Sequence, residues 1–338
     1  MKVLVVKISA LGDVVMALPL LDALRRRDPA ARVTWVCGAQ VEPLLKALAA
    51  PPETVAVDEA ALLKGGPWAR LKALAGLWRR LFLRRFDLVL VGHSDWRFGL
   101  PALFCRAGAR RSFGPGRRGP LPGRFHGDEY ARLALGGDGP REGGARIPVL
   151  KVPVPAWMQA ELGRGRGGLV ALAPGGAKNL LRDDALRRWP LEHYARLAGM
   201  FRKKGFRVLL AGSPGDAWTR AAFGGAGVLD FIGRTSLTDL VALLSRCRLL
   251  VTHDSGPMHL AALAGVPCLA LFGPTQPAEK VAPGGRTEAL WGGADLACRP
   301  CYDGRNYAAC GDNACLRGLS VETVFGKALR MARPGRDS

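Results

Sequence analysis

The chain has 338 residues, 49% of them hydrophobic, which is enough for two domains that each bury their own core. Lys and Arg number 49 against 28 Asp and Glu, so the formal net charge is +21. The composition excludes a disordered chain, and the charge favours anionic partners: nucleic acid, an anionic membrane surface or phosphorylated substrates. An Arg-rich composition is also typical of GC-rich genomes, so charge alone does not choose among these partners.

The first residues of the chain predict a buried strand and not a targeting segment. Residues 2–6 read Lys-Val-Leu-Val-Val, without the basic region, long apolar region and cleavage site of a signal peptide. No uninterrupted apolar run approaches the roughly 20 residues that cross a bilayer. We therefore expect a cytoplasmic protein, whose eight cysteines are thiols or ligands and not disulfides.

Strand and helix patterns alternate along the first half of the chain, which predicts a parallel, doubly wound α/β sheet. The helix expected at residues 68–85 is amphipathic and strongly basic. Residues 108–144 are rich in Gly, Pro and Arg, and we expect loops there. Strands are expected at 1–6, 32–36, 54–57 and 86–92, and the other helices at 14–27 and 41–49.

A glycine-rich linker is expected at residues 163–168, and the pattern restarts after it. Two such units in tandem predict a two-domain α/β architecture with an interdomain cleft. We expect domains at residues 1–162 and 168–320, then a C-terminal helix and tail at 321–338. In the second domain, strands are expected at 169–173, 206–211, 228–232, 249–252 and 266–272, and helices at 191–204, 237–246 and 257–264.

The most informative segment is residues 253–259, which read His-Asp-Ser-Gly-Pro-Met-His and predict a tight turn followed by a helix start. A helix N-terminus presents free N–H groups and a positive dipole end, so it binds anions. Gly256 lets a phosphate approach the backbone, and Ser255 and His259 add side-chain donors. The alternative is an ordinary strand–helix connection in which Asp254 or Ser255 caps the helix.

This segment belongs to a longer string: Asp-Ser-Gly-Pro-Met-His-Leu-Ala at 254–261, Ala-Gly-Val-Pro at 264–267 and Leu-Phe-Gly-Pro-Thr at 271–275. The string closely resembles the donor-site motif of glycosyltransferase family 9, the heptosyltransferases, where this region holds the nucleotide diphosphate sugar. Ligands of open α/β sheets bind beyond the carboxyl ends of strands, so Gly273 and Thr275 are expected at the same edge.

The resemblance covers roughly residues 1–333. It implies the GT-B fold, two Rossmann-like doubly wound domains facing a central cleft, with the donor in the C-terminal domain and the acceptor in the N-terminal one. It also implies inversion at the anomeric carbon by direct displacement.

Residues 7–13 read Lys-Ile-Ser-Ala-Leu-Gly-Asp and resemble the first loop of the same family, whose aspartate is the proposed general base. A carboxylate can take the proton of a sugar hydroxyl as the new bond forms. The resemblance therefore implies that Asp13 is the catalytic base and that Lys7 represents the lysine of the family loop. The alternative is that Asp13 only caps the helix. The candidate acceptor-binding residues are Ser9, Gly12, His93 and His126, although a lone histidine is more often structural.

Residues 174–178 (Pro-Gly-Gly-Ala-Lys) and 187–190 (Arg-Arg-Trp-Pro) resemble the family's Pro-Gly loop and its basic pair before Trp-Pro. Arginine pairs bidentately with phosphate, and cations stabilise a departing diphosphate. An insertion at 179–184 leaves open which basic residue meets the phosphates, and each arginine could instead be a surface charge. Residues 233–237 also resemble the family and predict a turn with Ser236 as a helix N-cap. The predicted donor-binding residues are Lys178, Arg187, Arg188, Gly212, Asp254, Ser255, Gly256, His259, Gly273 and Thr275.

Four cysteines lie close together late in the second domain, within residues 298–315. Four thiolates in a cytosolic protein suit a structural Zn²⁺, although an Fe–S cluster and free thiols are alternatives. No cofactor is expected for catalysis, because no D-x-D motif is present and cationic side chains can neutralise the leaving group. The candidate ligands are Cys298, Cys301, Cys310 and Cys315.

The function implied by the resemblance is transfer of a heptose, or a related sugar, from a nucleotide diphosphate sugar such as ADP-heptose to a lipopolysaccharide core or similar glycolipid. The expected partners are that donor, a lipid-linked phosphorylated glycan acceptor and the anionic inner face of the cytoplasmic membrane, on which the basic helix at 68–85 would dock. Three alternatives stay open: a transferase with another nucleotide sugar and acceptor, a nucleic-acid-binding protein, and an inactive sugar-binding protein. We expect no nucleic-acid partner, because no helix-turn-helix, RNP or zinc-finger pattern is present.

Overall fold

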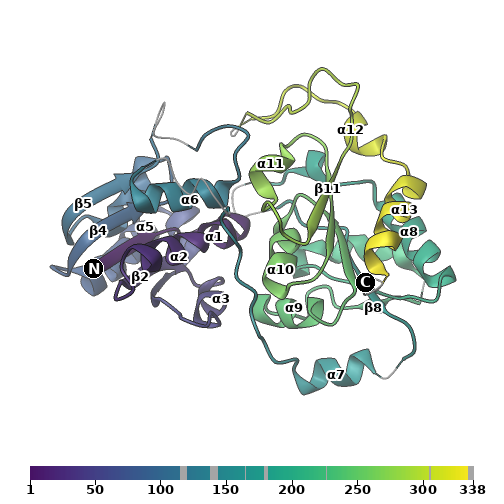
Figure 1. Ribbon diagram of the computed structural model, residues 1–338, viewed down its shortest axis with the longest axis horizontal. Coiled ribbons are helices and arrows are strands. Elements are labelled where there is room, and N and C mark those ends of the chain that lie inside the picture. The colour runs from purple at the N-terminus through teal and green to yellow at the C-terminus, as the bar shows by residue number, and fades with distance from the viewer. Residues whose placement is uncertain are drawn as a thin grey trace. The chain divides into compact units, whose positions relative to one another are not determined.

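The computed structural model describes residues 1–114, 120–137, 144–163, 165–178, 182–225, 227–303 and 306–333 (Figure 1). It divides into two compact units. The first is Met1–Pro148, and the second comprises Val149–Lys178 and the chain from Arg182 onward. Each unit has its own parallel sheet and its own core, as expected for an α/β protein of this length.

The first unit is built on a five-stranded parallel sheet in the order β3-β2-β1-β4-β5. This doubly wound order places β1 at the centre, where Val3, Leu4, Val5 and Val6 are fully buried because helices cover both faces. The strands are β1 (Lys2–Val6), β2 (Arg32–Gly38), β3 (Glu53–Val57), β4 (Arg85–Val91) and β5 (Arg106–Ser112).

Helices cover both faces of this sheet. On one face, Leu77 and Leu81 of α5 pack against the core residues Leu4, Val36 and Val89. Helices α1, α2 and α6 pack against one another in a separate group (Figure 1). The helices are α1 (Leu11–Ala17), α2 (Pro19–Arg27), α3 (Glu42–Lys46), α4 (Glu59–Leu63), α5 (Pro67–Leu81), the 3-10 helix η1 (Trp96–Ala102) and α6 (His126–Leu135).

Two expectations for the first unit differ from the structure. The helix expected at 14–27 is two helices, because Pro19 has no N–H to continue α1 and instead begins α2 at its first position. The loop region expected at 108–144 contains most of β5 and all of α6. Its glycines and arginines concealed a helix whose buried side chains include Tyr130 and Leu133. Residues 115–119 and 138–143 lie outside the described residues.

The second unit is built on a six-stranded parallel sheet in the order β11-β10-β9-β6-β7-β8. Its central strands read as continuous apolar runs, since they are buried on both faces. The strands are β6 (Leu169–Ala173), β7 (Arg207–Leu210), β8 (Leu229–Asp230), β9 (Leu249–His253), β10 (Cys268–Phe272) and β11 (Thr287–Trp291).

One face of the second sheet is covered by α8 and by α13 near the C-terminus. Tyr194, Leu197 and Phe201 of α8 and Val324 of α13 are fully buried there. Ser236 caps α9 by accepting from the Asp239 amide, so the predicted N-cap is confirmed. The helices are α7 (Ala156–Leu162), η3 (Ala185–Arg187), α8 (Leu191–Lys203), η4 (Pro214–Phe223), α9 (Leu237–Leu244), α10 (Gly256–Ala264), α11 (Pro277–Lys280), α12 (Ala314–Arg317) and α13 (Val321–Ala332).

The division between the units falls at Pro148, before the glycine-rich segment at 163–168 where it was expected. The intervening residues belong to the second unit. The Leu150 amide donates to the Leu263 carbonyl, and Arg207 donates to the carbonyl of Leu162 in α7. Likewise α13 packs on α8 and is part of the second core, not a separate segment.

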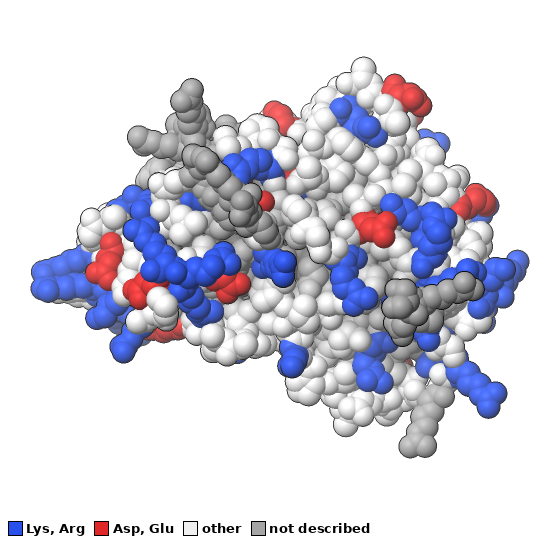
Figure 2. Space-filling view, viewed as in Figure 1, with Lys and Arg blue, Asp and Glu red and all other residues white. Residues whose placement is uncertain are grey.

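No helix in the described ranges is long and apolar enough to cross a membrane. On the face drawn in Figure 2, basic side chains gather over the first unit at the end of its sheet. The edge strand β5 carries Arg106, Arg110 and Arg111, and charges of this kind protect an exposed edge from pairing with other strands.

Candidate active site

Polar side chains lie at the carboxyl end of β1 in the first unit. Lys7 directly follows the strand and is 2% exposed, and its Nζ lies 3.1 Å from Asp13 Oδ2. Asp13 is 39% exposed, so its carboxylate reaches solvent while the ammonium group is buried. A buried cation requires a compensating anion, so this ion pair fixes the position of the Asp13 side chain.

Asp13 lies in the first turn of α1, not at its N-cap. The N-cap is Ala10, which makes no side-chain capping bond. The alternative that Asp13 only caps the helix is therefore wrong. Its carboxylate is held by Lys7.

His93 follows β4 and lies beside the same loop. Its Nε2 accepts from the Ile8 amide at 3.4 Å, and its ring stacks on Phe98 with centroids 3.7 Å apart. Burial, together with the nearby Lys7 ammonium, lowers the pKa of His93 to about 2. The imidazole is therefore neutral at physiological pH, and it positions the loop by accepting the hydrogen bond from Ile8.

The other predicted acceptor residues occupy the same end of the first unit. Ser9 and Gly12 are half-buried in the loop between β1 and Asp13. His126 is the first residue of α6, which packs against α1. One turn later in α6, the buried ring of Tyr130 lies 5.8 Å from Lys7 Nζ. A role in acceptor binding stays a prediction for these residues.

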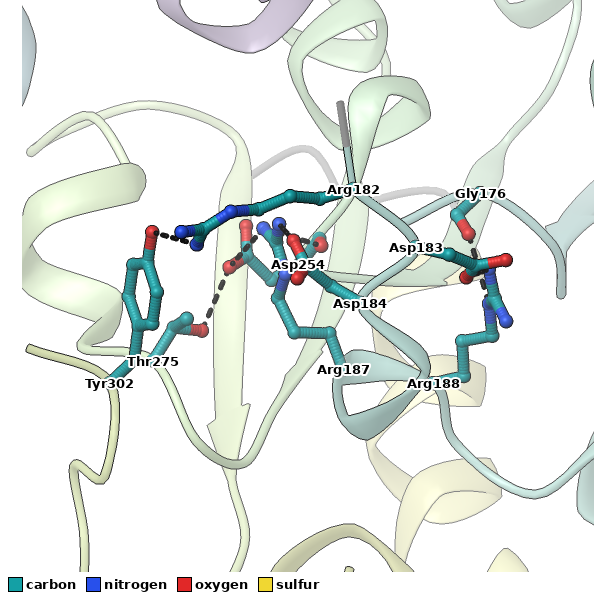
Figure 3. A network of polar contacts seen from close by, with 9 residues as sticks. All are labelled: Gly176, Arg182, Asp183, Asp184, Arg187, Arg188, Asp254, Thr275 and Tyr302. Carbon is teal, nitrogen blue, oxygen red and sulfur yellow. Dashed lines mark hydrogen bonds and ion pairs between the residues drawn. The ribbon is translucent and has the colours of Figure 1, made fainter. Parts of the chain in front are cut away.

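A second polar cluster lies at the carboxyl ends of β9 and β10 in the second unit (Figure 3). Arg187 binds Asp184 at 2.5 Å and Asp254 Oδ2 at 3.2 Å. Thr275 Oγ1 donates to the same Asp254 oxygen at 2.8 Å. Figure 3 shows Arg187 between the two carboxylates, and Thr275 beside Asp254. We name Asp184, Arg187, Asp254 and Thr275 the donor cluster.

Electrostatics keep the donor cluster charged although it is buried. Burial alone would raise the pKa of Asp254, but Arg187, Lys280 and the Thr275 hydroxyl together hold it below its ordinary value. Burial opposes the charge on Arg187, yet the two carboxylates raise its pKa further above the physiological range. The cluster therefore keeps a permanent guanidinium at the strand ends, paired with two carboxylates.

Arg188 and Lys178 lie elsewhere. Arg188 donates through Nε to the Gly176 carbonyl at 3.0 Å and pairs with Asp183, so it supports the loop after β6. Lys178 is 59% exposed and lies 3.8 Å from Asp183. Within the described residues, Arg187 is the one predicted phosphate-binding cation that contacts Asp254. Residues 179–181 of the expected insertion lie outside those residues.

The start of α10 has the form expected of an anion site. Ser255 is the N-cap by its backbone, but its hydroxyl contacts Thr252 and the His253 carbonyl and does not cap the helix. Gly256 begins the helix, and His259 is buried one turn further along it. Ser255 is therefore the N-cap residue, as the alternative expected, but its side chain does not cap the helix, which begins directly at the donor cluster.

A side chain at either of the two remaining glycines would crowd its neighbours. A Cβ on Gly212 would lie 3.1 Å from Asp216, and one on Gly273 would lie 2.6 Å from Cys315 Sγ. Asp216 is buried and accepts from the Gly176 amide at 2.7 Å and from Ser213. Ligand contacts of the glycines stay a prediction.

Asp184 and Asp216 were not among the predicted site residues. Asp184 lies three residues before Arg187, a spacing that one helical turn brings together, so this partner was in principle detectable. Asp216 contacts a loop forty residues away in sequence, which no local pattern indicates.

The cysteines expected to bind a metal do not form a ligand set. Within the ranges that the structure describes, no three His, Cys, Asp or Glu side chains are placed to hold an ion. Cys298 and Cys310 are exposed, and Cys301 and Cys315 are half-buried. The loop instead packs on the donor side of the sheet, because the Cys301 amide donates to the Pro274 carbonyl.

Two doubly wound parallel sheets, with polar residues at the carboxyl ends of strands in each, define the GT-B class of glycosyltransferase fold. The solved structure of ADP-heptose lipopolysaccharide heptosyltransferase II from Escherichia coli has this fold. It superposes with a TM-score of 0.73 at 22% identity, over 98% of each chain.

The sequence is similar to one family of glycosyltransferases. Residues 170–310 match the family model of glycosyltransferase family 9 (heptosyltransferase). The chain is 28% identical to lipopolysaccharide heptosyltransferase 2 of Salmonella typhimurium, over 82% of this chain and 84% of that protein. It is 29% identical to lipopolysaccharide heptosyltransferase 1 of Pseudomonas aeruginosa, over 89% and 86%. The chain is therefore similar over most of its length to lipopolysaccharide heptosyltransferases, its residues 170–310 match glycosyltransferase family 9, and it is a glycosyltransferase.

Proposed function

We propose that this protein transfers a heptose from ADP-heptose to the core region of a lipopolysaccharide acceptor, with inversion at the anomeric carbon. The observation that carries the proposal is the partly buried Arg187 beside Asp254 and the start of α10, in a chain whose relatives are lipopolysaccharide heptosyltransferases. Lipopolysaccharide heptosyltransferases 1 and 2 are both matched at similar identity. The proposed acceptor is therefore a lipopolysaccharide core, and the two enzyme types are not distinguished.

Asp13 acts as the general base in this proposal. Its carboxylate is partly exposed, so an acceptor hydroxyl can approach it, and Lys7 fixes it from the buried side. As the hydroxyl oxygen attacks the anomeric carbon, its proton passes to the carboxylate, and the bond to the leaving diphosphate breaks. Attack from the face opposite the leaving group inverts the configuration.

Arg187 and the N-terminus of α10 stabilise the leaving diphosphate. The guanidinium is already held by Asp184 and Asp254, so it needs no reorganisation when charge develops on the leaving oxygen. The helix end adds free N–H groups and the positive end of its dipole. These cationic groups provide the charge neutralisation, and we propose that catalysis needs no metal ion or other cofactor.

A donor screen tests this assignment. Ligands that bind only the folded state raise the melting temperature by mass action. We expect ADP and ADP-heptose to raise the melting temperature more than GDP-, UDP- or dTDP-sugars at equal concentration. A larger shift with another nucleotide sugar would instead support the alternative transferase with a different donor.

We further propose that the enzyme works at the inner face of the cytoplasmic membrane, docked through α5. This helix has two apolar sides: Ala73, Leu77 and Leu81 pack toward the core of the first unit. A second side, the α5 apolar face, comprises Trp68, Leu71, Ala75 and Trp78, at intervals of three and four residues. Trp68 is 82% exposed, so no part of the described chain covers that end of the face.

Further exposed apolar residues extend the α5 apolar face. Trp78 stacks edge-on against Phe104, with centroids 5.0 Å apart, and the Leu83 amide donates to the Phe104 carbonyl. Leu83 and Phe104 are themselves exposed, and Lys72 and Arg79 lie beside the face on α5. Aromatic residues bordered by cations fit the interface of an anionic bilayer, with the helix lying in its plane.

Vesicle sedimentation tests the docking. We expect binding to vesicles that contain about 30% anionic lipid and little binding to neutral ones, because cations near the surface contribute about 1 kcal/mol each. Trp68→Ser with Leu71→Ser should lose most of this binding. Trp157→Ser, which changes an exposed tryptophan of the second unit, is the matched control. Binding that ignores anionic lipid content would refute the docking.

Thiols of the Cys-rich loop and thiols of the buried core should differ in their reactivity. Since the described residues form no metal site, we expect the exposed loop thiols of Cys298 and Cys310 to react rapidly with a disulfide reagent in the native state. The half-buried thiols of Cys301 and Cys315, whose pKa is raised by burial, should react more slowly. The four buried thiols should react only after unfolding. Metal analysis should find no stoichiometric zinc or iron. Stoichiometric metal, with loop thiols that react only after chelation, would show that the loop binds an ion. The buried thiols are Cys37, Cys105, Cys247 and Cys268.

A further inference from the structure

Three buried polar atoms in or near the donor cluster have no hydrogen-bond partner among the described residues. Arg187 Nε belongs to the cluster, Gln276 Oε1 comes from the residue after Thr275, and Tyr307 Oη comes from a side chain on which the charges of Arg187 and Asp254 act. They are half of the six such atoms found among the described residues. Leaving a buried donor or acceptor unpaired costs about 1–3 kcal/mol, so such atoms are rare unless a ligand pairs with them. Their concentration around Arg187 and Asp254 indicates a ligand position that is built but unfilled by protein groups.

Tyr307 reaches this position from the Cys-rich loop, which the predicted donor site did not include. Tyr302 and Tyr307 pair as an antiparallel bridge, and their rings lie 4.7 Å apart. The amides of Cys301 and Tyr302 both donate to the Pro274 carbonyl. Pro274 immediately precedes Thr275, which donates to Asp254. The tyrosine pair is therefore attached to the segment that positions the donor cluster.

The two tyrosines differ in their surroundings. The Tyr302 hydroxyl accepts from Arg182 at 3.4 Å, as Figure 3 shows. The Tyr307 hydroxyl is buried, and the charges of Arg187, Asp184 and Asp254 act on it. Burial is the main reason that the pKa of Tyr307 is raised, so its phenol keeps its proton throughout the physiological range.

A protonated phenol and the Nε–H of Arg187 are both donors, and the guanidinium adds positive charge. Two donors at one cation select an anionic oxygen over a sugar hydroxyl, because charge-assisted bonds to phosphate are about twice as strong as neutral ones. Gln276 Oε1 is an acceptor only, so it suits a hydroxyl group of the same ligand.

We propose that Tyr307 is a donor-binding residue, whose hydroxyl acts with Arg187 Nε to hold the diphosphate of the nucleotide sugar. This inference rests on the proposed function, since it concerns the same donor site. It gives the Cys-rich loop a place in the active site: the loop carries the phenol that contacts the leaving group.

Calorimetric titration of the full chain with ADP and with AMP tests the inference. We expect Tyr307→Phe to weaken ADP binding about tenfold, the loss of one hydrogen bond to a charged group. AMP binding should change less than about twofold, because AMP lacks the second phosphate. Tyr302→Phe, which removes the neighbouring hydroxyl, is the matched control and should change ADP binding less than about twofold. The melting temperature of ligand-free Tyr307→Phe should not fall, since the variant removes an unpaired buried hydroxyl.

The outcomes separate the two proposals. Equal weakening of ADP and AMP, or no change in either, would overturn the role of Tyr307 while the heptosyltransferase assignment stands. A lower melting temperature with unchanged ADP affinity would show that the hydroxyl is only structural. If the unmodified protein binds neither ADP nor ADP-heptose, the proposed function itself fails.

Discussion

Replacing Asp13 by Asn should lower kcat by about 10²–10⁴-fold, the usual contribution of a general base. Asn keeps the shape of the side chain but cannot accept the proton of the acceptor hydroxyl. Because Asp13 belongs to the first unit and the donor cluster to the second, ADP affinity should change less than about twofold. Initial rates of ADP release at saturating acceptor measure the first effect, and calorimetry measures the second.

Lys7 complicates this variant, because Asp13→Asn leaves a buried ammonium without that carboxylate. Unfolding free energy should therefore fall as well, and the double variant Lys7→Met with Asp13→Asn separates the two effects. It should recover stability, since replacing a whole buried pair is often neutral. It should not recover activity. Full activity in the folded double variant would remove Asp13 from the mechanism.

Replacing Arg187 by Met should have the second large effect. The leaving diphosphate loses its buried cation, and removal of one such group costs about 10²–10³-fold in kcat. The variant also leaves Asp184 and Asp254 without their guanidinium, which should destabilise the fold by about 3 kcal/mol. Arg187→Lys keeps the charge but cannot contact both carboxylates in the same geometry. Its kcat and its stability should therefore lie between those of the unmodified protein and those of Arg187→Met.

The double variant Arg187→Met with Asp254→Asn separates stability from catalysis. It removes the uncompensated charge at Asp254, so the melting temperature should rise above that of Arg187→Met alone. ADP binding and turnover should stay low. If this double variant bound ADP like the unmodified protein, Arg187 would be a structural residue and the diphosphate would be held elsewhere.

Much of the fold could be predicted from the sequence, because parallel strands buried on both faces read as apolar runs. The strands around Val3 and Val251 are examples. The unit boundary was misplaced because glycines at 163–168 resemble a linker, whereas the contacts of Leu162 and Leu150 that join α7 to the second unit are non-local. The helix α6 was missed because arginine and glycine dominate its surroundings.

Donor-site residues could be predicted from the sequence where they lie in one short motif, but not where the site depends on contacts between separate loops. Asp254 and Arg187 stand in short motifs, and the structure joins them. Lys178 also lies in a short motif, but its side chain pairs with Asp183. The spacing of residues in the sequence does not predict this ion pair. Tyr307 lies more than fifty residues from Asp254 in sequence, so only the folded chain brings it to the cluster.

Heptosyl transfer from ADP-heptose can be observed by incubating the protein with ADP-heptose and heptose-deficient lipopolysaccharide. Mass spectrometry of the acceptor should show the addition of one heptose, ADP should be released in equal amount, and the new linkage should have the inverted anomeric configuration. An acceptor that stays unmodified with ADP-heptose, but gains a sugar from another nucleotide donor, would contradict the account.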